Sequence, residues 1–507
     1  MSVNPISVQL SPQQLDGGSA FSNLADPRLL RELAYIDGRW TAAPSAASFV
    51  VSDPASRRQI ARVASLGGTE ARRAIDAAER AFSDWRTRPP QDRADILDAW
   101  YRLILSSRED LALIMTLEQG KPLAEALGEI DYAASFVSWY AAEAKRLNVE
   151  SVTSHLPDAE MFVRREPVGI AALFTPWNFP SAMLTRKAAA ALAAGCTIVA
   201  HPSSYTPLSA LALAELAERA GFPPGVLNIV TGDPGAISAV FCDDPRIRAV
   251  SFTGSTRIGR MIGARCAATV KRLILELGGH APLIVCDDAD LARAVDIAMA
   301  AKFATSGQDC LAANRIFVQR KLYGAFCDAF AERIRCLRTG SGLDPSVDIG
   351  PLMHDASLAK ARSQIENALK HGARRIVGET RDDGSLFLAP TLLVDVPDDA
   401  LVMREETFAP IAAVTPFDTD DEVIRRANAT EYGLVAYVVT GNISRAMRFN
   451  RALDYGMVAI NRVKITGAPV PFGGTKQSGL GREGSRHGIE AFTDLKYTCL
   501  DISSPGE

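Results

Sequence analysis

The strongest constraint on the fold is the alternation of short apolar runs with segments of helical periodicity between residues 169 and 259. A strand, a helix and a further strand predict a βαβ unit, and a series of such units predicts a parallel sheet. Ligands bind such sheets at the carboxyl ends of the strands, so we expect a nucleotide-binding α/β domain here. Strands are expected at 169–174, 197–200, 226–230 and 248–253, and helices at 180–194 and 207–220, the second with Thr206 as N-cap.

The same alternation resumes after residue 281 and predicts a second α/β series that runs to about residue 417. Before the first series, residues 69–100 and 109–148 have apolar side chains at helical spacing, which predicts amphipathic helices. Residues 149–165 are polar and punctuated by proline, so we expect an extended excursion there. A Gly-rich tail from residue 471 ends in a further expected strand at 494–500.

Composition narrows the class of protein. The chain has 507 residues, 47% of them hydrophobic and 22% charged, which is typical of a globular protein with two or three structural units. A formal charge of -4 provides no field for nucleic acid or an anionic membrane. Residues 1–27 lack a signal-peptide pattern, no run approaches the ~20 apolar residues of a membrane span, and the eight cysteines include no CxxC pair. We therefore expect a reduced, cytoplasmic chain without a metal site.

Three residues are candidates for chemistry. Cys310 follows Gly307 in a polar turn after a helix, where a thiol can lie near oxyanion-binding N–H groups; a buried structural cysteine is the alternative. Glu276 lies among apolar neighbours before a Gly-Gly turn, where burial would suit it to act as a general base, unless it faces solvent. Asn178 lies in a turn between two prolines and either donates to an oxyanion or caps the next helix.

These residues belong to a longer series of motifs that resembles the aldehyde dehydrogenase superfamily, and within it most closely the succinate-semialdehyde dehydrogenases. The motifs occur in the family's order from about residue 35 to residue 500, so the resemblance covers nearly the whole chain. They are residues 116–125, 175–180, 252–256, 276–279, 307–310, 405–408, 471–474 and 478–484.

The resemblance implies a joint role for the three candidates. Cys310 attacks an aldehyde as a thiolate, while its own N–H and the Asn178 amide hold the oxyanion. Hydride passes to a nicotinamide dinucleotide, and Glu276 activates the water that hydrolyses the thioester. The alternative class is a non-catalytic protein with the same fold. The presence of all three residues together argues against it. The implied dinucleotide contacts are Trp177, His201, Ser203, Ser204, Gly254, Ser255, Leu277 and Glu406.

Two of these contacts depart from the family's pattern. His201 stands where the family usually has a lysine, and a neutral imidazole supplies no permanent charge to the 2′-phosphate of NADP. Ser204 stands where NAD-preferring relatives often have Glu, and its small side chain leaves room for that phosphate. We leave NAD and NADP open with a slight preference for NAD, because losing the cation should weaken phosphate binding more than losing the acid strengthens it.

The expected substrate site also departs from the pattern. In succinate-semialdehyde dehydrogenases, two arginines and a serine hold the substrate carboxylate at the end opposite the aldehyde. In this chain Arg186 matches the first arginine, Ala304 occupies the position of the second, and Thr466 occupies the position of the serine. Losing one guanidinium removes a contact worth about 1.5–3 kcal/mol, which Arg462 or Lys464 would have to replace. Succinic semialdehyde is the leading substrate, and another ω-carboxy aldehyde (glutaric or 2-oxoglutaric semialdehyde), an aliphatic aldehyde or an aromatic aldehyde is the alternative.

The resemblance further implies a Rossmann-type NAD(P)-binding domain, an α/β catalytic domain and a small β flap that joins subunits into a homodimer or homotetramer. Ala312 occupies the position of a second, redox-active cysteine in many relatives, so that local switch is expected to be absent. We assign residues 1–140 and 159–275 to the NAD(P)-binding domain, 276–470 to the catalytic domain, and 141–158 with 471–507 to the oligomerisation segment.

Overall fold

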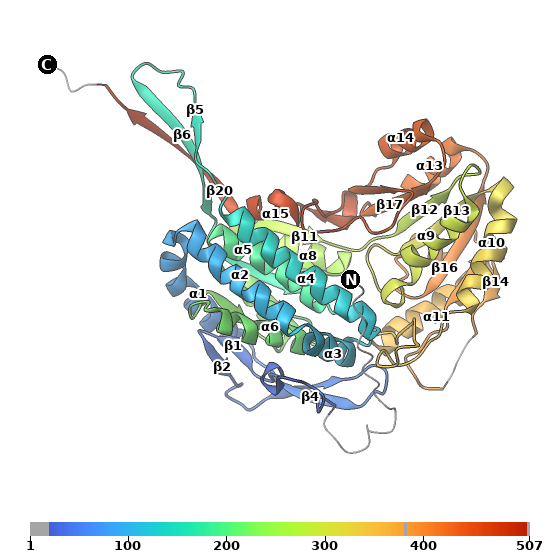
Figure 1. Ribbon diagram of the computed structural model, residues 1–507, viewed down its shortest axis with the longest axis horizontal. Helices are drawn as coiled ribbons and strands as arrows, with labels where there is room; N and C mark the ends of the chain where they lie inside the picture. Colours follow the sequence, from blue (N-terminus) through green and yellow to red (C-terminus); the bar gives the residue numbers. More distant parts are fainter. Residues whose placement is uncertain (1–19, 380–382, 504–507) are drawn as a thin grey trace, which may run out of the picture.

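The computed structural model describes residues 20–379 and 383–503. Two α/β lobes lie side by side, and a narrow ribbon of strands extends away from the first lobe (Figure 1). Residues 1–19 and 504–507 of the expected domains lie outside the described residues. None of the helices in the described ranges is long and apolar enough to cross a membrane.

The first lobe contains an eight-stranded sheet whose centre is parallel. Its central strands are buried along their whole length, as expected for a sheet covered by helices on both faces. In order across the sheet the strands are β19 (Gly479–Leu480), β11 (Arg272–Glu276), β10 (Ile247–Thr253), β7 (Ile170–Thr175), β8 (Thr197–Pro202), β9 (Leu227–Ile229), β1 (Ala34–Ile36) and β2 (Arg39–Thr41).

Helix α5 (Pro180–Ala194) is the central helix of this lobe, and all of its residues are buried. Its many alanines allow α4 (Leu123–Ala144) to pack closely along it, and Gly195 ends it in the left-handed conformation that favours glycine. The remaining helices of the lobe are α1 (Gly68–Thr87), α2 (Pro90–Ser106), α3 (Arg108–Gln119), α6 (Pro207–Ala220), α7 (Pro234–Asp243) and α8 (Thr256–Cys266).

The second lobe is built on a seven-stranded sheet, parallel except at β14. In order across the sheet the strands are β14 (Arg374–Val377), β15 (Thr391–Val394), β16 (Ile411–Phe417), β13 (Ala313–Gln319), β12 (Ala281–Val285), β17 (Val435–Val439) and β18 (Met457–Ile460). The helices of this lobe are α9 (Leu291–Phe303), α10 (Arg320–Arg335), α11 (Asp355–Lys370), α12 (Leu401–Arg404), α13 (Asp420–Asn428) and α14 (Ile443–Ala452).

The ribbon is a three-stranded antiparallel sheet of β5 (Glu150–Val152), β6 (Ala159–Pro167) and β20 (Thr493–Asp501) (Figure 1). Two structural details bear on the boundaries expected from the sequence. Strand β6 pairs with β20 along its whole length, although residue 159 was the expected start of the second NAD(P)-binding segment. In the tail, β19 joins the first sheet and α15 (Ser485–Glu490) packs on α5, so only β20 lies in the ribbon. A separate hairpin contains β3 (Ser48–Ser52) and β4 (Gln59–Ala64).

Candidate active site

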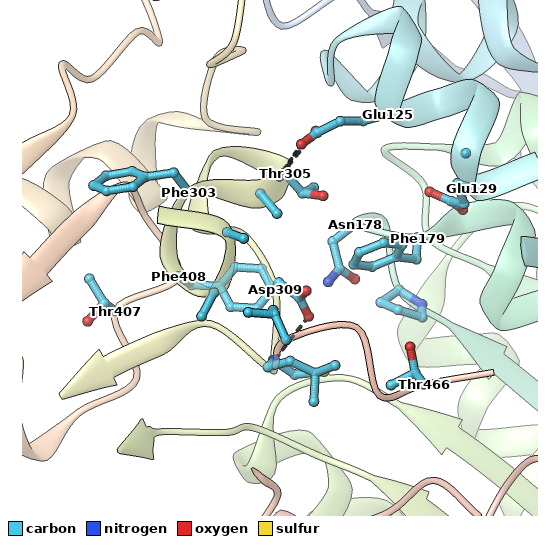
Figure 2. Close-up of a pocket in the computed structure, with 18 of the residues that line it drawn as sticks. Glu125, Glu129, Asn178, Phe179, Phe303, Thr305, Asp309, Thr407, Phe408 and Thr466 are labelled. Carbon is cyan, nitrogen blue, oxygen red and sulfur yellow. Dashed lines mark hydrogen bonds between the residues drawn. The ribbon is translucent and has the colours of Figure 1, made fainter. Parts of the chain in front are cut away.

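A cavity of about 1230 Å³ lies between the two lobes (Figure 2). The first lobe contributes residues at the carboxyl ends of β7, β10 and β11. The second lobe contributes the loops that lead into β12, β13 and β16. The cavity therefore lies at the edge of the sheet where the sequence predicted a ligand.

Cys310 lines this cavity at the end of a strained loop that follows α9. Thr305 and Ser306 both have positive φ, 50° and 56°, which is uncommon for residues other than glycine. Two contacts hold them in this conformation: the Glu125 carboxylate accepts a hydrogen bond from the Thr305 N–H at 2.9 Å, and the Ser306 hydroxyl donates to the Gly350 carbonyl at 3.1 Å. Figure 2 shows the first of these contacts. The loop thus fixes the thiol inside the cavity instead of burying it in the core.

Glu276 is the last residue of β11 and is 2% exposed, so the alternative of a solvent-facing carboxylate does not hold. The Cys310 thiol interacts with its carboxylate, while Oε1 has no hydrogen-bond partner in the protein. Burial, opposed by the charge of Arg186, raises the pKa of Glu276 to about 8. Gly279 is essential to this arrangement, because a Cβ there would meet the Cys310 carbonyl oxygen at 2.0 Å.

Asn178 does not cap α5, whose N-cap is Phe179. Its Nδ2 instead donates to the Gln308 carbonyl at 3.0 Å, across the cavity and beside the cysteine loop. A buried Lys121–Glu129 ion pair holds the Asn178 turn, since Lys121 Nζ also donates to the Asn178 carbonyl at 2.8 Å. The amide has a second N–H, which leaves it free to donate to an oxyanion at Cys310.

The electrostatic environment keeps the Cys310 thiol protonated at neutral pH. Burial, together with the carboxylates of Glu276 and Asp309, raises the pKa of Cys310 well above its usual value. A thiol of this kind needs a base to accept its proton before it can act as a nucleophile. Glu276 is in contact with it and is suited to that task.

The raised pKa of Glu276 predicts a pH dependence of the reaction. Below a pH of about 8 this carboxyl group holds its proton and cannot act as a base. We expect kcat/KM to rise about tenfold per pH unit through the acid range and to level off above about pH 8. Initial rates at saturating dinucleotide and low aldehyde concentration measure this profile. A profile that is flat from about pH 6 to about pH 9 would contradict the assignment of Glu276 as base.

Five of the expected dinucleotide contacts line the cavity, namely Trp177, Gly254, Ser255, Leu277 and Glu406. Helix α8 begins beside them without a side-chain cap at Ser255 and without an acidic residue in its first turn. An uncapped helix N-terminus of this kind is suited to bind a pyrophosphate, because its free N–H groups and dipole favour an anion. The Glu406 carboxylate, whose pKa burial raises to about 7, accepts the Gly279 N–H at 2.9 Å and has a second oxygen for a ribose hydroxyl. These residues fit a dinucleotide.

The other three expected contacts, His201, Ser203 and Ser204, follow the same sheet edge but do not line the cavity itself. His201 lies near the end of β8, and its Nδ1 is 2.8 Å from the Val230 carbonyl oxygen. A carbonyl can only accept, so Nδ1 carries the proton, and burial lowers the pKa of the ring. His201 is therefore neutral and presents Nε2 as an acceptor.

Both expected substrate contacts, Arg186 and Thr466, line the cavity. Arg186 is buried and its Nε lies 2.7 Å from a carboxylate oxygen of Glu483, while its Nη1 has no hydrogen-bond partner in the protein. The Tyr132 hydroxyl interacts with both Arg186 and Thr466. Ala304, in the position of the second arginine, contributes no charge.

Sequence reasoning missed two residues of this site. Asp309 lines the cavity directly before Cys310, and its position next to the candidate nucleophile was the signal that could have identified it. Tyr132 reaches the cavity from α4, and nothing in the periodicity of that helix distinguishes it from a core aromatic residue. A contact between α4 and the loop of Thr466 follows only from the tertiary structure.

The fold and this arrangement of thiol, carboxylate and amide define an α/β oxidoreductase. The family model described as the aldehyde dehydrogenase family matches residues 40–498, and the chain belongs to that family. It is an enzyme that oxidises aldehydes.

Several relatives match over nearly their whole length. A non-phosphorylating aspartate-semialdehyde dehydrogenase of Halomonas elongata is 53% identical over 480 residues, which are 94% of this chain and 97% of that protein. An NADP(+) succinate-semialdehyde dehydrogenase of Escherichia coli is 48% identical over 480 residues, 94% of this chain and 100% of that protein. The crystal structure of succinate-semialdehyde dehydrogenase from Burkholderia pseudomallei superposes with a TM-score of 0.94 at 48% identity, covering 95% of this chain and 100% of that chain.

Proposed function

We propose that the protein oxidises a small aldehyde with a carboxylate at its far end to the corresponding acid, through a thioester on Cys310. The observation that carries the proposal is the geometry of one cavity. It holds the Cys310 thiol, the unpartnered Oε1 of Glu276, the Asn178 amide and, deeper in the protein, the unpartnered Nη1 of Arg186.

The residues act in a fixed order. Glu276 takes the proton of the Cys310 thiol, and the sulfur attacks the aldehyde carbon. The oxygen becomes an oxyanion that accepts hydrogen bonds from the Asn178 amide and the Cys310 N–H. The dinucleotide that Trp177, Gly254, Ser255 and Glu406 would hold supplies a hydride acceptor when bound, and loss of hydride from this carbon would leave a thioester on Cys310. Glu276 then releases the thiol proton to solvent and takes a proton from water, the hydroxide attacks the thioester carbon, and the acid leaves as the sulfur regains a proton.

The far carboxylate is the group that selects the substrate. The relatives named for succinate semialdehyde and aspartate semialdehyde share such a carboxylate. In this chain the buried Arg186, with its unpartnered Nη1, and the half-buried Tyr132 and Thr466 form a polar group that supports binding of this carboxylate. Succinic semialdehyde is the simplest substrate of this class.

Initial-rate kinetics test the proposal. Succinic semialdehyde, glutaric semialdehyde, hexanal and benzaldehyde are compared, each with NAD and with NADP, and the Cys310→Ala variant serves as control. We expect the two semialdehydes to exceed the uncharged aldehydes in kcat/KM by about tenfold or more, because the charged contact is lost with the latter. Faster oxidation of hexanal or benzaldehyde would reject the carboxylate anchor.

For the cofactor we propose a preference for NAD over NADP. The neutral His201 presents an acceptor to a ribose hydroxyl but no charge to a 2′-phosphate. His201→Lys should raise kcat/KM for NADP relative to NAD by about tenfold. Ser204→Glu is the matched control and should depress NADP use while sparing NAD. An NADP preference in the unmodified protein would overturn this part of the proposal.

For the assembly we propose that the ribbon joins two or more copies of this chain. Strands β5 and β20 are its free edges, and β20 exposes Leu495, Tyr497 and Leu500, at 63%, 55% and 49%. Exposed edges with apolar side chains pair with another chain. Analytical ultracentrifugation should give a dimer or tetramer for the unmodified protein and a smaller species for the double variant Leu495→Asp with Tyr497→Asp. A monomer in both samples would contradict the assignment.

A further inference from the structure

A carboxylate lies directly beside the candidate nucleophile. Asp309 precedes Cys310 and lines the cavity, and its Oδ1 accepts a hydrogen bond from the Leu311 N–H at 3.0 Å. Figure 2 shows its carboxylate turned toward the side of the cavity where Asn178 and Thr466 lie. Within residues 20–379 and 383–503, no lysine or arginine forms an ion pair with this carboxylate. The Leu311 contact uses one oxygen, and the adjacent Cys310 thiol also interacts with this carboxylate.

The two lysines whose charges act on Asp309 both have other partners. Lys121 forms its ion pair with Glu129. Lys302 donates to the Asn314 side-chain oxygen at 2.7 Å, and burial lowers its pKa to about 7, so it carries only part of a charge. Burial raises the pKa of Asp309, so a cationic group of a ligand beside it would favour its charged form.

This carboxylate is costly for an enzyme that takes only anionic aldehydes. Its negative charge, together with that of Glu276, raises the pKa of the Cys310 thiol and so disfavours the thiolate. It also repels an anionic substrate at close range. The guanidinium of Arg186 forms its ion pair with Glu483 at 2.7 Å and not with Asp309, while its Nη1 stays without a hydrogen-bond partner in the protein. A cationic group on the substrate would relieve both effects.

We propose that the substrate is an amino-acid semialdehyde whose ammonium group pairs with Asp309 while its carboxylate is held at Arg186 and Thr466. The inference rests on the proposed function, because it uses the same cavity and the same attack by Cys310. It identifies Asp309 as the residue that separates amino-substituted semialdehydes from plain ones.

The covalent structure of such a substrate places its ammonium group near the reacting carbon. In aspartate β-semialdehyde one carbon separates the aldehyde carbon from the carbon that carries both the ammonium and the carboxylate. When Cys310 attacks the aldehyde, the ammonium lies within a few bonds of the sulfur, close to the side chain of the adjacent Asp309. The positive charge then offsets the two carboxylates around the thiol and favours the thiolate that attacks.

Aspartate β-semialdehyde and succinic semialdehyde make a matched pair, since they differ by one ammonium group. Both are measured with butanal as the uncharged four-carbon aldehyde, at a pH where the amine is charged. For the unmodified protein we expect kcat/KM to favour aspartate β-semialdehyde over succinic semialdehyde by about tenfold or more. In Asp309→Asn the Leu311 hydrogen bond is kept, and the preference should fall to about one because the charge is gone.

Two further variants distinguish direct pairing of Asp309 with the substrate ammonium group from a purely structural role of this residue. Asp309→Glu keeps the charge and should restore a preference for the amino-substituted aldehyde. Asp348→Asn removes a carboxylate from the outer part of the same cavity and should leave the preference unchanged. A preference near one in the unmodified protein, or the same preference in Asp309→Asn, would overturn the inference. If only this inference fails, the protein still oxidises succinic semialdehyde. If the proposed function fails, none of the three aldehydes is oxidised in a reaction that depends on Cys310.

Discussion

Cys310→Ala should lower kcat/KM for every aldehyde by about a thousandfold or more, since it removes the only group that can form the thioester. Within the described residues, Cys310 is the one cysteine that lines the cavity. Five of the others are buried or half-buried in the lobes, and Cys336 and Cys499 are exposed on the surface. Activity is measured by the absorbance of the reduced dinucleotide.

A control variant separates loss of the nucleophile from loss of a thiol in general. Cys327→Ala removes a half-buried thiol from α10, away from the cavity, and should retain activity near that of the unmodified protein. Dinucleotide binding, followed by fluorescence quenching, should persist in Cys310→Ala because that residue is not among the expected cofactor contacts. Substantial turnover in Cys310→Ala would contradict a thioester mechanism.

Glu276→Gln should divide the reaction into its two stages. The amide has nearly the same shape but cannot accept a proton, so water is no longer activated to hydrolyse the thioester. Steady-state turnover should fall by about a hundredfold to ten-thousandfold, a range typical of removing a general base. Attack on the aldehyde slows as well, yet one equivalent of reduced dinucleotide per subunit should form before the rate drops.

Stopped-flow absorbance distinguishes this burst from uniform slowing. Glu431→Gln is a suitable control, because that carboxylate pairs with Arg260 at the surface and takes no part in the cavity. Its turnover should match the unmodified protein. A Glu276→Gln variant that shows multiple fast turnovers would mean that another base hydrolyses the thioester.

Several strands and helices of the first lobe could be predicted because they have clear periodicities and clear ends. The expected helix at 180–194 is α5, and the strand expected at 248–253 is β10 (Ile247–Thr253). Thr206 is the N-cap of α6 as predicted, but its side chain does not cap the helix. The Glu118 carboxylate accepts the Leu208 and Ser209 N–H groups instead, both at 2.8 Å.

The cap of α6 shows that a local sequence pattern cannot identify a capping group from a distant part of the chain. The carboxylate that caps α6 lies 90 residues away in sequence, whereas the local spacing predicted that the Thr206 hydroxyl would cap it. The same holds for Asn178, for which the residues alone left capping and oxyanion binding open. Only the approach of the Gln308 carbonyl from the other lobe decides that its amide faces the cysteine loop.

Glu276 was easier to place, since apolar neighbours on a strand predict burial and burial predicts a raised pKa. Asp309 was harder, because a polar residue in a turn ordinarily faces solvent. Its contribution follows from the way the lobes enclose the turn around Cys310. The boundary of the ribbon at β6 was likewise set by pairing with β20, more than three hundred residues further along the chain.

Mass spectrometry of the Glu276→Gln variant shows whether a thioester forms on Cys310. The variant is mixed with dinucleotide and succinic semialdehyde, quenched in acid, digested and mapped. We predict one acyl group per chain, with a mass gain equal to that of the aldehyde less two hydrogen atoms, on the peptide that contains Cys310 and on no other peptide. Its absence despite formation of reduced dinucleotide, or its presence on a different residue, would contradict thioester catalysis at Cys310.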